Sequence, residues 1–428
     1  MAEQHGKTLV PQIRFAGFTD PWEQRKLGDI LQERNVRTSD FESNPIFSLT
    51  IEDGITPKTD RYERTSLIAK TEDLFKIVSP NEFVTNPMNL RFGAFGYNKN
   101  SLSVCVSGYY DVFSIDNDKC SGFWNSYFKT PVALKRFDDA ATGSLIEKRR
   151  VKYSTLCQLI FLMPKGMGEK KQIGAFFDRL DSLITLHQRK YDKLCVLKKS
   201  MLDKMFPKGG SLYPEIRFAG FTDPWEQRKL GDVARRVTRK NENRDSDLPL
   251  TISAQYGLVD QRTFFNNQVA SKDMSGYFLL HKGEFAYNKS TSTDSPWGAI
   301  KRLEKYDMGC VSTLYICFEL LSGDPDFLVT YYETDRWYKS VQLIAAEGAR
   351  NHGLLNIAPD DFFETQICIP KRIDEQRRIG AFFDRLDSLI TLHQRKYCGV
   401  ASWMLGVALV RLGSESDGAF GEMKHVLR

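Results

Sequence analysis

The chain lacks the sequence patterns that identify a disulfide framework, a zinc site or a nucleotide-hydrolysing site. Its eight cysteines are dispersed, and no two of them form a C-x-x-C pair. Neither a metal site nor a set of disulfides is therefore expected, and a reducing compartment fits better. No phosphate-binding loop of the form G-x-x-x-x-G-K-[ST] occurs, so this chain is not expected to hydrolyse ATP.

Long apolar runs are also missing. No stretch of 18 apolar residues occurs, and the first 30 residues contain no apolar run followed by a cleavage site. We therefore expect a cytoplasmic protein without a membrane segment. The formal net charge of +6 permits a polyanionic partner but does not require one.

Two short motifs suggest catalysis, and both are incomplete. Asn86-Pro87-Met88-Asn89 resembles the Asn-Pro-Pro-aromatic element of amino-methyltransferases, but it lacks the second proline and the aromatic ring. Pro359-Asp360-Asp361 could open a nuclease carboxylate cluster, yet no Glu-x-Lys follows it on a strand. Neither G-x-S-x-G nor H-E-x-x-H occurs. We expect a turn at Pro359-Asp360-Asp361, no catalytic role for Asn86, and no catalytic residue in this chain.

The chain contains an internal repeat. Pro11–Asp29 returns as Pro214–Asp232 with one change in 19 positions, and Ile173–Tyr191 returns unchanged as Ile379–Tyr397. The offsets are 203 and 206 residues, and the segments between the blocks hardly match. This pattern indicates one frame, used twice, that holds two different inserts.

A long helix is predicted from Glu169 to Phe206. No proline interrupts this segment, and a series of mostly apolar residues is spaced alternately by four and by three positions, as in the seam of a coiled coil. The seam positions in this segment are Ile173, Phe177, Leu180, Ile184, His187, Tyr191, Leu194, Lys198, Met201 and Met205. The second copy begins after Pro370 and has the same phase at Ile379, Phe383, Leu386, Ile390, His393 and Tyr397. The first helix would be about 57 Å long. The simplest way to bury both seams is an antiparallel coiled coil. The two histidines are interpreted as packed seam residues.

Residues 30–163 and 233–369 contain short alternating or β-branched runs separated by Gly, Asn, Asp and Ser, which predicts two compact α+β domains. The expected organisation is a first domain at 1–163, a first helix at 164–210, a second domain at 211–369, a second helix at 370–412 and a tail at 413–428. The fold class is therefore α+β with a pseudo-twofold repeat.

Basic residues near the start of each domain could neutralise phosphates, although such runs also occur on solvated faces. Polar Tyr-Asn-Lys motifs recur at 97–99 and 287–289; we favour a structural role, and base or backbone contact is the alternative. The candidate DNA-binding residues are Arg34, Arg37, Lys58, Arg61, Arg64, Asn98, Lys99, Arg235, Arg236, Arg239, Arg262, Asn288 and Lys289.

These features resemble the specificity subunit of type I restriction–modification systems. The resemblance rests on I-R-F-A-G-F-T-D-P-W-E-Q-R-K-L-G-D in both halves, the stretch from Pro296 to Arg302, and the Pro-Lys…I-G-A-F-F-D helix starts at 164 and 370. It covers residues 11 to 397. It implies two target-recognition domains, each for one half of a split DNA target, and two helices that set the spacing.

The resemblance also implies partners and cofactors. The subunit would be non-catalytic, bind double-stranded DNA, dock two methyltransferase subunits and join two motor-nuclease subunits. S-adenosylmethionine, ATP and Mg would be bound by those partners, and none by this chain.

One departure concerns the end of the chain. After Tyr397 the sequence no longer follows the first helix, and Gly399 and Gly406 each weaken a helix by about 1 kcal/mol relative to alanine. Two other classes of function remain open. A self-contained restriction or methylation enzyme would need the missing motifs, and a coiled-coil scaffold that binds only proteins would not explain two unlike domains.

Overall fold

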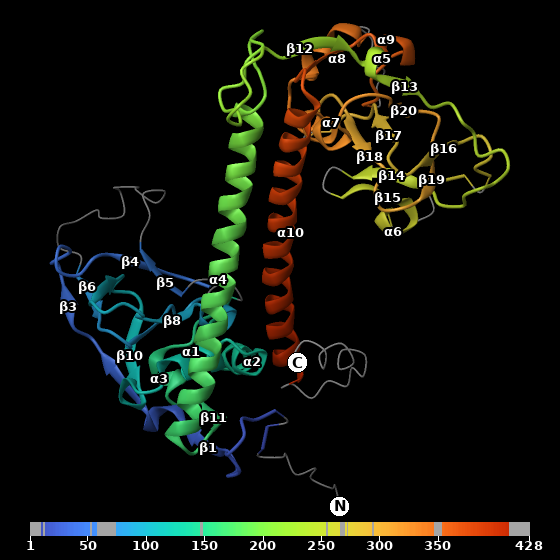
Figure 1. Cartoon of the computed structure of the whole chain (residues 1–428). Helices are drawn as coiled ribbons and strands as arrows, with labels where there is room; N and C mark the ends of the chain where they lie inside the picture. Colours follow the sequence, from blue (N-terminus) through green and yellow to red (C-terminus); the bar gives the residue numbers. More distant parts are fainter. Residues whose placement is uncertain are drawn as a thin grey trace, which may run out of the picture. The chain divides into compact units, whose positions relative to one another are not determined.

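The computed structural model describes residues 10–11, 13–51, 54–57, 74–145, 149–253, 256–265, 270–271, 273–292, 295–345 and 353–410, with side chains described as far as 396, apart from that of residue 118. It divides into two compact units: Met1–Gln188 with Arg395–Arg428, and Arg189–Gln394. Two helices of 38 residues, α4 (Met167–Lys204) and α10 (Ile373–Val410), each begin in one unit and end in the other (Figure 1).

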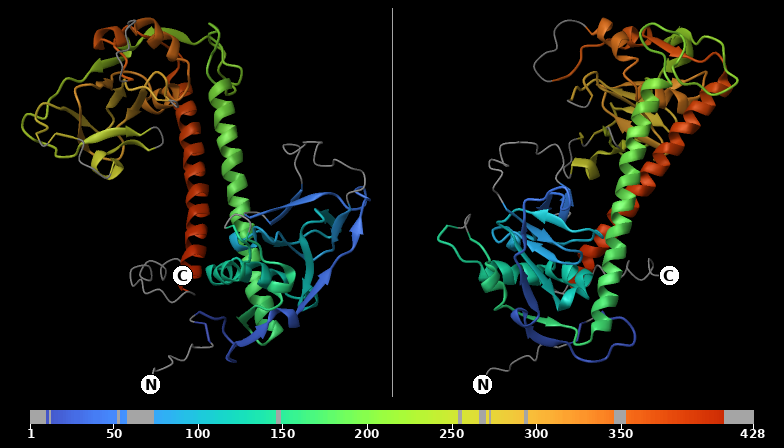
Figure 2. Two further views of the ribbon diagram at one scale, coloured as in Figure 1. Left: turned by 180° about the vertical axis from the view of Figure 1, so that it is seen from behind. Right: turned by 90° about the vertical axis from the view of Figure 1, so that its left-hand side faces the viewer.

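Antiparallel sheets make up most of the first unit. A four-stranded sheet has the order β2-β10-β7-β8, a three-stranded sheet the order β3-β6-β9, and two further pairs are β4-β5 and β1-β11. The strands are β1 (Glu23–Lys26), β2 (Leu31–Arg34), β3 (Arg37–Thr38), β4 (Phe47–Thr50), β5 (Gly54–Pro57), β6 (Phe75–Val78), β7 (Phe83–Thr85), β8 (Phe95–Tyr97), β9 (Val104–Val106), β10 (Asp111–Ile115) and β11 (Ile160–Met163). Figure 2 shows these sheets, in blue and cyan, beside the first half of α4.

Short helices cover the core of the first unit: α1 (Ser121–Phe128), α2 (Pro131–Ala140), α3 (Tyr153–Leu156), and three 3-10 turns, η1 (Leu27–Asp29), η4 (Leu90–Phe92) and η5 (Asp116–Asp118). Helix α2 begins where the sequence favours it, because Pro131 stands in its first turn and the Thr130 hydroxyl accepts a hydrogen bond from the Ala133 amide. An aromatic core includes Phe95, Phe113 and Trp124 together with Ile173 of α4, and a separate, smaller cluster of valines contains no residue of α4.

The second unit has the same kinds of element. Its strands are β12 (Glu226–Lys229), β13 (Ala234–Arg236), β14 (Leu250–Ser253), β15 (Gly257–Asp260), β16 (Phe278–His281), β17 (Phe285–Asn288), β18 (Ala299–Arg302), β19 (Met308–Val311), β20 (Ile316–Leu320) and β21 (Gln366–Ile369). Its short helices are α5 (Leu230–Val233), α6 (Gln261–Phe265), α7 (Pro325–Tyr332), α8 (Tyr338–Ile344) and α9 (Pro359–Phe363).

The two inserts share a topology that their sequences do not reveal. The four-stranded sheet β2-β10-β7-β8 corresponds to β13-β20-β17-β18, and the pair β1-β11 corresponds to β12-β21. Before β8 stands Phe92-Gly93-Ala94 and before β18 stands Trp297-Gly298-Ala299, each with a glycine at positive φ, 96° and 79°. The inserts are therefore variants of one domain.

The Tyr-Asn-Lys motifs, in contrast, lie on strands that do not correspond. The first is at the end of β8, whereas the second is at the end of β17, whose counterpart in the first unit is β7. The residue that corresponds to Asn288 is thus Asn86. Both side chains accept a hydrogen bond from the amide two residues on, Met88 at 3.1 Å and Ser290 at 3.0 Å. Such bonds define Asx-turns, so Asn86 has a structural role here.

The other motif considered for catalysis also has a structural place. Pro359, Asp360 and Asp361 form the first turn of α9, where carboxylates complement the helix dipole.

In the second unit, the end of α4 packs against the start of α10. Met205 and Phe206, just beyond α4, are buried in one core with Ile379, Phe383 and Leu386 of α10. The ring centroids of Phe206 and Phe383 lie 6.2 Å apart, and Lys198, earlier in α4, contacts Asp387, later in α10. The two segments therefore run in opposite directions within this unit. No helix in the described part of the chain is both long and apolar enough to cross a membrane.

Candidate nucleic-acid interface

A part-buried ion pair joins the first repeated block to the start of α4 in the first unit. The Arg14 guanidinium donates to both carboxylate oxygens of Glu169, with Nε and Nη2 each 2.7 Å away, and the Trp22 indole Nε1 donates to the same carboxylate at 3.2 Å. Arg14 and Trp22 come from the first block, and Glu169 belongs to the first turn of α4. The Glu169 carboxylate is 2% exposed, so this bidentate pair fixes the start of the helix to the start of the domain.

The same three residues recur in the second unit. Arg217 donates to Glu375 at 2.7 and 2.8 Å, and Trp225 Nε1 donates at 3.3 Å. Sequence analysis missed both glutamates because they lie just outside the repeated block. The sequence does contain a signal, because each glutamate stands four residues before the repeated isoleucine, Ile173 or Ile379. We call Arg14–Glu169–Trp22 and Arg217–Glu375–Trp225 the frame links.

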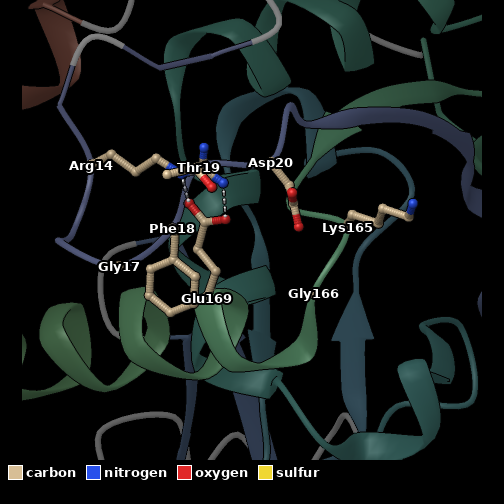
Figure 3. A pocket seen from close by; sticks show the side chains of 8 residues that line it. All are labelled: Arg14, Gly17, Phe18, Thr19, Asp20, Lys165, Gly166 and Glu169. Carbon is tan, nitrogen blue, oxygen red and sulfur yellow. Dashed lines mark hydrogen bonds and ion pairs between the residues drawn. The ribbon is translucent and has the colours of Figure 1, made fainter.

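A small hollow lies beside the first frame link (Figure 3). Its lining comes from the repeated block and from the start of α4: Arg14, Gly17, Phe18, Thr19, Asp20, Lys165, Gly166 and Glu169. In the second unit the corresponding Phe221 is covered by two cations, Arg372 and Arg378, 5.0 and 5.3 Å from its ring centroid. In the first unit, glycine and glutamine occupy the positions of these arginines, so the two frames differ here.

Most of the candidate arginines are paired with carboxylates of their own domain. Arg34 lies 3.3 Å from Glu82, Arg239 2.8 Å from Glu284, and Arg262 3.1 Å from Asp260. Arg235 pairs with Glu319, and Arg236 lies 3.7 Å from Asp360. These five arginines therefore carry less net positive charge to a partner than their sequence positions suggest.

Arg37 has no such carboxylate among its described contacts. Its Nε donates to Asn35 at 3.3 Å, and its guanidinium lies by the turn at Gly108. Beside it, Val36 is 61% exposed and Tyr109 is 71% exposed. We call Val36, Arg37 and Tyr109 the first tip, because they stand at the edge of the three-stranded sheet and at the β9–β10 turn.

The second unit exposes different side chains on its smaller sheets. Phe264 and Phe265 of α6 are each 46% exposed, and Tyr256 is 54% exposed, with Lys305 5.7 Å from its ring centroid. We call these three aromatic residues the second tip. The first unit thus exposes an arginine with a valine and a tyrosine, whereas the second unit exposes three aromatic residues, of which Phe264 and Phe265 contact each other. The two units therefore offer different chemistry to a ligand.

The structure gives the polar motif residues internal partners. The Asn98 side chain is 1% exposed, and its amide donates to the carbonyls of Val78 and Leu102, both at 2.9 Å. Lys99 lies 3.1 Å from Asp178. Lys289 donates to the Ile357 carbonyl at 3.2 Å, and burial lowers its pKa. Candidates Lys58, Arg61 and Arg64 lie outside the described residues.

The predicted seam residues have two different environments. At the helix starts they contact the preceding domain: Ile173 is 6% exposed within the core of the first unit, and Phe177 packs against it. Ile379, Phe383 and Leu386 are buried in the second unit, where Leu194 packs against the same core. Leu180, Ile184, Tyr191 and Ile390 are half-buried, and the Tyr397 side chain lies outside the description. Within the described residues, no group of three His, Cys, Asp or Glu side chains is arranged to hold a metal ion.

Comparison with solved structures identifies the fold. The S subunit of a type I restriction–modification system from M. genitalium matches 95% of this chain and 100% of its own, with a TM-score of 0.57 and 10% sequence identity. The chain thus has the fold of a type I S subunit, and the resemblance drawn from the repeats is confirmed at the level of the fold.

Two further structures match with a TM-score of 0.41, too low to carry an argument. They are an HsdS subunit from Thermoanaerobacter tengcongensis, with 13% identity over 92% of this chain and 98% of its own, and a structure described by complex assembly and conformational transition of the type I R-M system, with 12% identity over 91% and 97%. A scan against known protein families finds no match, and neither does a search of curated proteins.

Proposed function

We propose that this chain is the DNA-recognition subunit of a type I restriction–modification complex, and that each unit binds one half of an asymmetric, two-part DNA target. The observation that carries this proposal is the pair of identical frame links under unlike tips. Identical frames are suited to holding two copies of one partner, and unlike tips are suited to two different half-sites.

In this proposal the chain itself is not an enzyme. The frames dock two methyltransferase subunits and the assembly adds two motor-nuclease subunits, which bind S-adenosylmethionine, ATP and Mg. Support comes from the missing nucleotide-binding and methyltransferase motifs and from the structural role of Asn86 in an Asx-turn. The proposed compartment is the cytoplasm.

The first tip offers a guanidinium, which can bind a phosphate or the edge of a guanine, next to apolar side chains, which can contact a thymine methyl group. The second tip offers aromatic rings, which can stack on or wedge between bases. The two tips would therefore select different base sequences.

The experiment is methylation of a random DNA pool by the full chain with its methyltransferase subunits and S-adenosylmethionine, followed by sequencing of the methylated fragments. We expect two different half-sites separated by a constant gap. Replacing residues 233–369 with residues 30–163 should convert the target into an inverted repeat, because both tips would then be the first tip. An unchanged target after this exchange would disprove the assignment of one half-site to each unit.

One observation favours the second candidate, a coiled-coil scaffold that binds only proteins: five of the candidate arginines are neutralised by carboxylates. For such a scaffold, the complex with methyltransferase subunits would form, but its affinity for DNA would not exceed that of the methyltransferase subunits alone. A gel-shift comparison of these two samples at equal salt distinguishes the candidates.

A further inference from the structure

The repeated segment Gly-Phe-Thr-Asp has different surroundings in the two units. Phe18 and Asp20 line the hollow beside the first frame link, and their counterparts in the second unit are Phe221 and Asp223. Phe18 is half-buried, whereas Phe221 is only 8% exposed. Because the segment itself is identical in both units, this difference comes from the residues that surround it.

An arginine covers the aromatic ring in the second unit. The Arg372 guanidinium carbon lies 5.0 Å from the Phe221 ring centroid, and the guanidinium donates to the Asp374 carboxylate at 3.0 and 2.7 Å. The hydrogen-bonded Asp374 raises the pKa of Arg372, and the nearby charge of Asp223 adds to this effect. A guanidinium therefore fits over this ring and near this aspartate.

The first unit has no counterpart of the covering arginine. With the offset of 206 residues between the helix blocks, the residues that stand in place of Arg372, Asp374 and Arg378 are Gly166, Gly168 and Gln172. Asp20 is exposed and takes part in no ion pair among the described residues. Lys165 also lines the hollow, but in Figure 3 its side chain extends away from Asp20.

The charges of the first hollow do not exclude a further cation. Arg14 is bound by Glu169, as Arg217 is bound by Glu375 in the second unit. The second unit places Arg372 over its phenylalanine beside that same kind of pair. The first hollow thus has the ring, the aspartate and the frame link of the second unit, without the arginine.

We propose that the hollow of the first unit binds an arginine side chain of a partner protein, which lies over Phe18 and near Asp20 as Arg372 lies over Phe221 and near Asp223. Exposed ion pairs and cation–π contacts contribute little by themselves. The arginine is therefore presented by a protein that has further contacts with the chain.

The partner that meets this condition is the methyltransferase subunit on the first frame, so this part rests on the proposed function. On the second frame, the chain's own Arg372 takes the place of the partner's arginine. Two identical methyltransferase subunits would then be held unequally by the two frames.

The first test uses the free full chain and N-acetyl-arginine amide as the probe. The fluorine signal of para-fluorophenylalanine, introduced at position 18 or at position 221, reports binding at each ring. We expect a saturable shift at position 18 in the millimolar range and no shift at position 221. N-acetyl-citrulline amide, which has a similar shape without the charge, should shift neither signal. A chain without a saturable shift at position 18, or with equal shifts for both amides, would overturn the proposal.

Inorganic phosphate at equal ionic strength tests an anion as the alternative occupant. The buried Arg14 Nη1 has no hydrogen-bond partner among the described residues and could donate to an anion. A saturable shift at position 18 with phosphate and none with the arginine amide would replace the proposed occupant.

The variant Gly166→Arg with Gly168→Asp gives the first hollow the residues of the second unit and leaves the net charge unchanged. A Cβ at Gly166 meets no atom within 4 Å, and a Cβ at Gly168 meets only Phe18 at 3.7 Å, so the variant should fold. Its own arginine should cover the ring, and the shift at position 18 should be lost. An undiminished shift in the folded variant would contradict the proposed site.

The reverse variant carries the test if that variant does not fold. Arg372→Gly, Asp374→Gly and Arg378→Gln give the second unit the residues of the first. This variant should gain a saturable shift at position 221 with the arginine amide. A folded reverse variant without this gain would also overturn the proposal.

Calorimetric titration of the full chain with methyltransferase subunits tests the partner. Gly166→Arg with Gly168→Asp should weaken binding of one subunit by about threefold to thirtyfold and leave the other unchanged, whereas the reverse variant should strengthen one. If no methyltransferase subunit binds the wild-type chain, the proposed function fails and the amide result still stands. If the subunits bind with the same affinities in wild type and in Gly166→Arg with Gly168→Asp, no arginine of this partner occupies the hollow and the proposal fails.

Discussion

Lys129 and Glu333 occupy the same place in the two units and carry opposite charges. Each is the C-cap of an equivalent helix, α1 or α7. Lys129 stands near Asp181 of α4, and Glu333 contacts Lys198 of α4. Each unit thus places at this C-cap a charge opposite to that of the α4 residue beside it.

The frame link of the second unit should be a major source of its stability. We expect Glu375→Gln to lower the free energy of unfolding by about 3 kcal/mol at most, because it leaves the Arg217 guanidinium, whose side chain is 14% exposed, without its anion. Thermal unfolding followed by circular dichroism measures this effect. The control is Glu364→Gln, whose partner Lys229 is exposed and which should change stability far less, because exposed ion pairs contribute little. Equal melting temperatures for the two variants would contradict the prediction.

Gly174 is expected to be required for close packing of α1 on α4. A Cβ at this position would stand 2.5 Å from the Phe123 amide nitrogen and 3.0 Å from the Gly122 carbonyl carbon. Gly174→Ala should therefore destabilise the first unit, although alanine favours a helix by about 1 kcal/mol. Gly168→Ala is the control in the same helix, since its Cβ would meet only Phe18 at 3.7 Å. Urea denaturation of both variants gives the comparison, and a stabilised Gly174→Ala would refute the packing argument.

Phe206 should anchor the end of α4 in the core of the second unit. Its side chain is 1% exposed and its ring lies 5.8 Å from that of Trp225. We expect Phe206→Ala to cost about 3–5 kcal/mol. Val196→Ala in α4 removes a side chain that is 69% exposed and should be nearly neutral. Chemical denaturation followed by tryptophan fluorescence measures the stability of both variants. Equal stabilities of Phe206→Ala and Val196→Ala would show that the end of α4 is not anchored in this core.

Stability that depends on the charge of Lys198 should disappear at high pH. Burial alone would lower the pKa of Lys198, but the carboxylates of Glu333 and Asp387 raise it above the ordinary value of 10.5. A raised pKa in the folded state means that the contribution is complete below 10.5 and is lost as the pH rises through the folded value. The difference in melting temperature between wild type and Lys198→Met should therefore be constant from pH 8 to about 10 and should decrease above it. A difference that already decreases near pH 8 would exclude this ion cluster as its source.

The unneutralised arginine of the first tip should contribute to DNA affinity more than the neutralised ones do. For the complex with methyltransferase subunits, Arg37→Ala should weaken binding to the cognate target and reduce the slope of log affinity against log salt by about 1. Arg262→Ala removes a cation already paired with Asp260 and should have a smaller effect. Fluorescence anisotropy at several salt concentrations measures both slopes; identical slopes would remove Arg37 from the proposed surface.

The repeat and the long helices could be predicted from sequence because they depend on local patterns. Uninterrupted spacing of four and three between Ile173 and Met205 predicts a helix wherever it packs. This four-and-three spacing does not show what each seam residue contacts. Ile173 faces its own domain, whereas Leu194 faces the core of the other unit, and this difference depends on tertiary packing.

The candidate DNA-binding residues were harder to predict because charge on a surface depends on neighbours that are distant in sequence. Arg34 and Glu82 are 48 residues apart and Arg239 and Glu284 are 45 apart, so their neutralisation is invisible along the chain. The Tyr-Asn-Lys motifs mislead for a related reason. A match of three residues does not determine the strand on which they lie. Gly93 and Gly298, each with positive φ, do occupy equivalent positions, before β8 and before β18.

The frame links have a consequence for how such a chain can change. Each link joins the polypeptide where it enters a unit to the polypeptide where it leaves, and β1-β11 and β12-β21 pair at the same point. Whatever lies between entry and exit therefore returns to the same place, whatever its own length or sequence. The two ends of each insert are held together by the frame link and by the strand pair. One insert can therefore be exchanged for another without moving the start of the helix that follows.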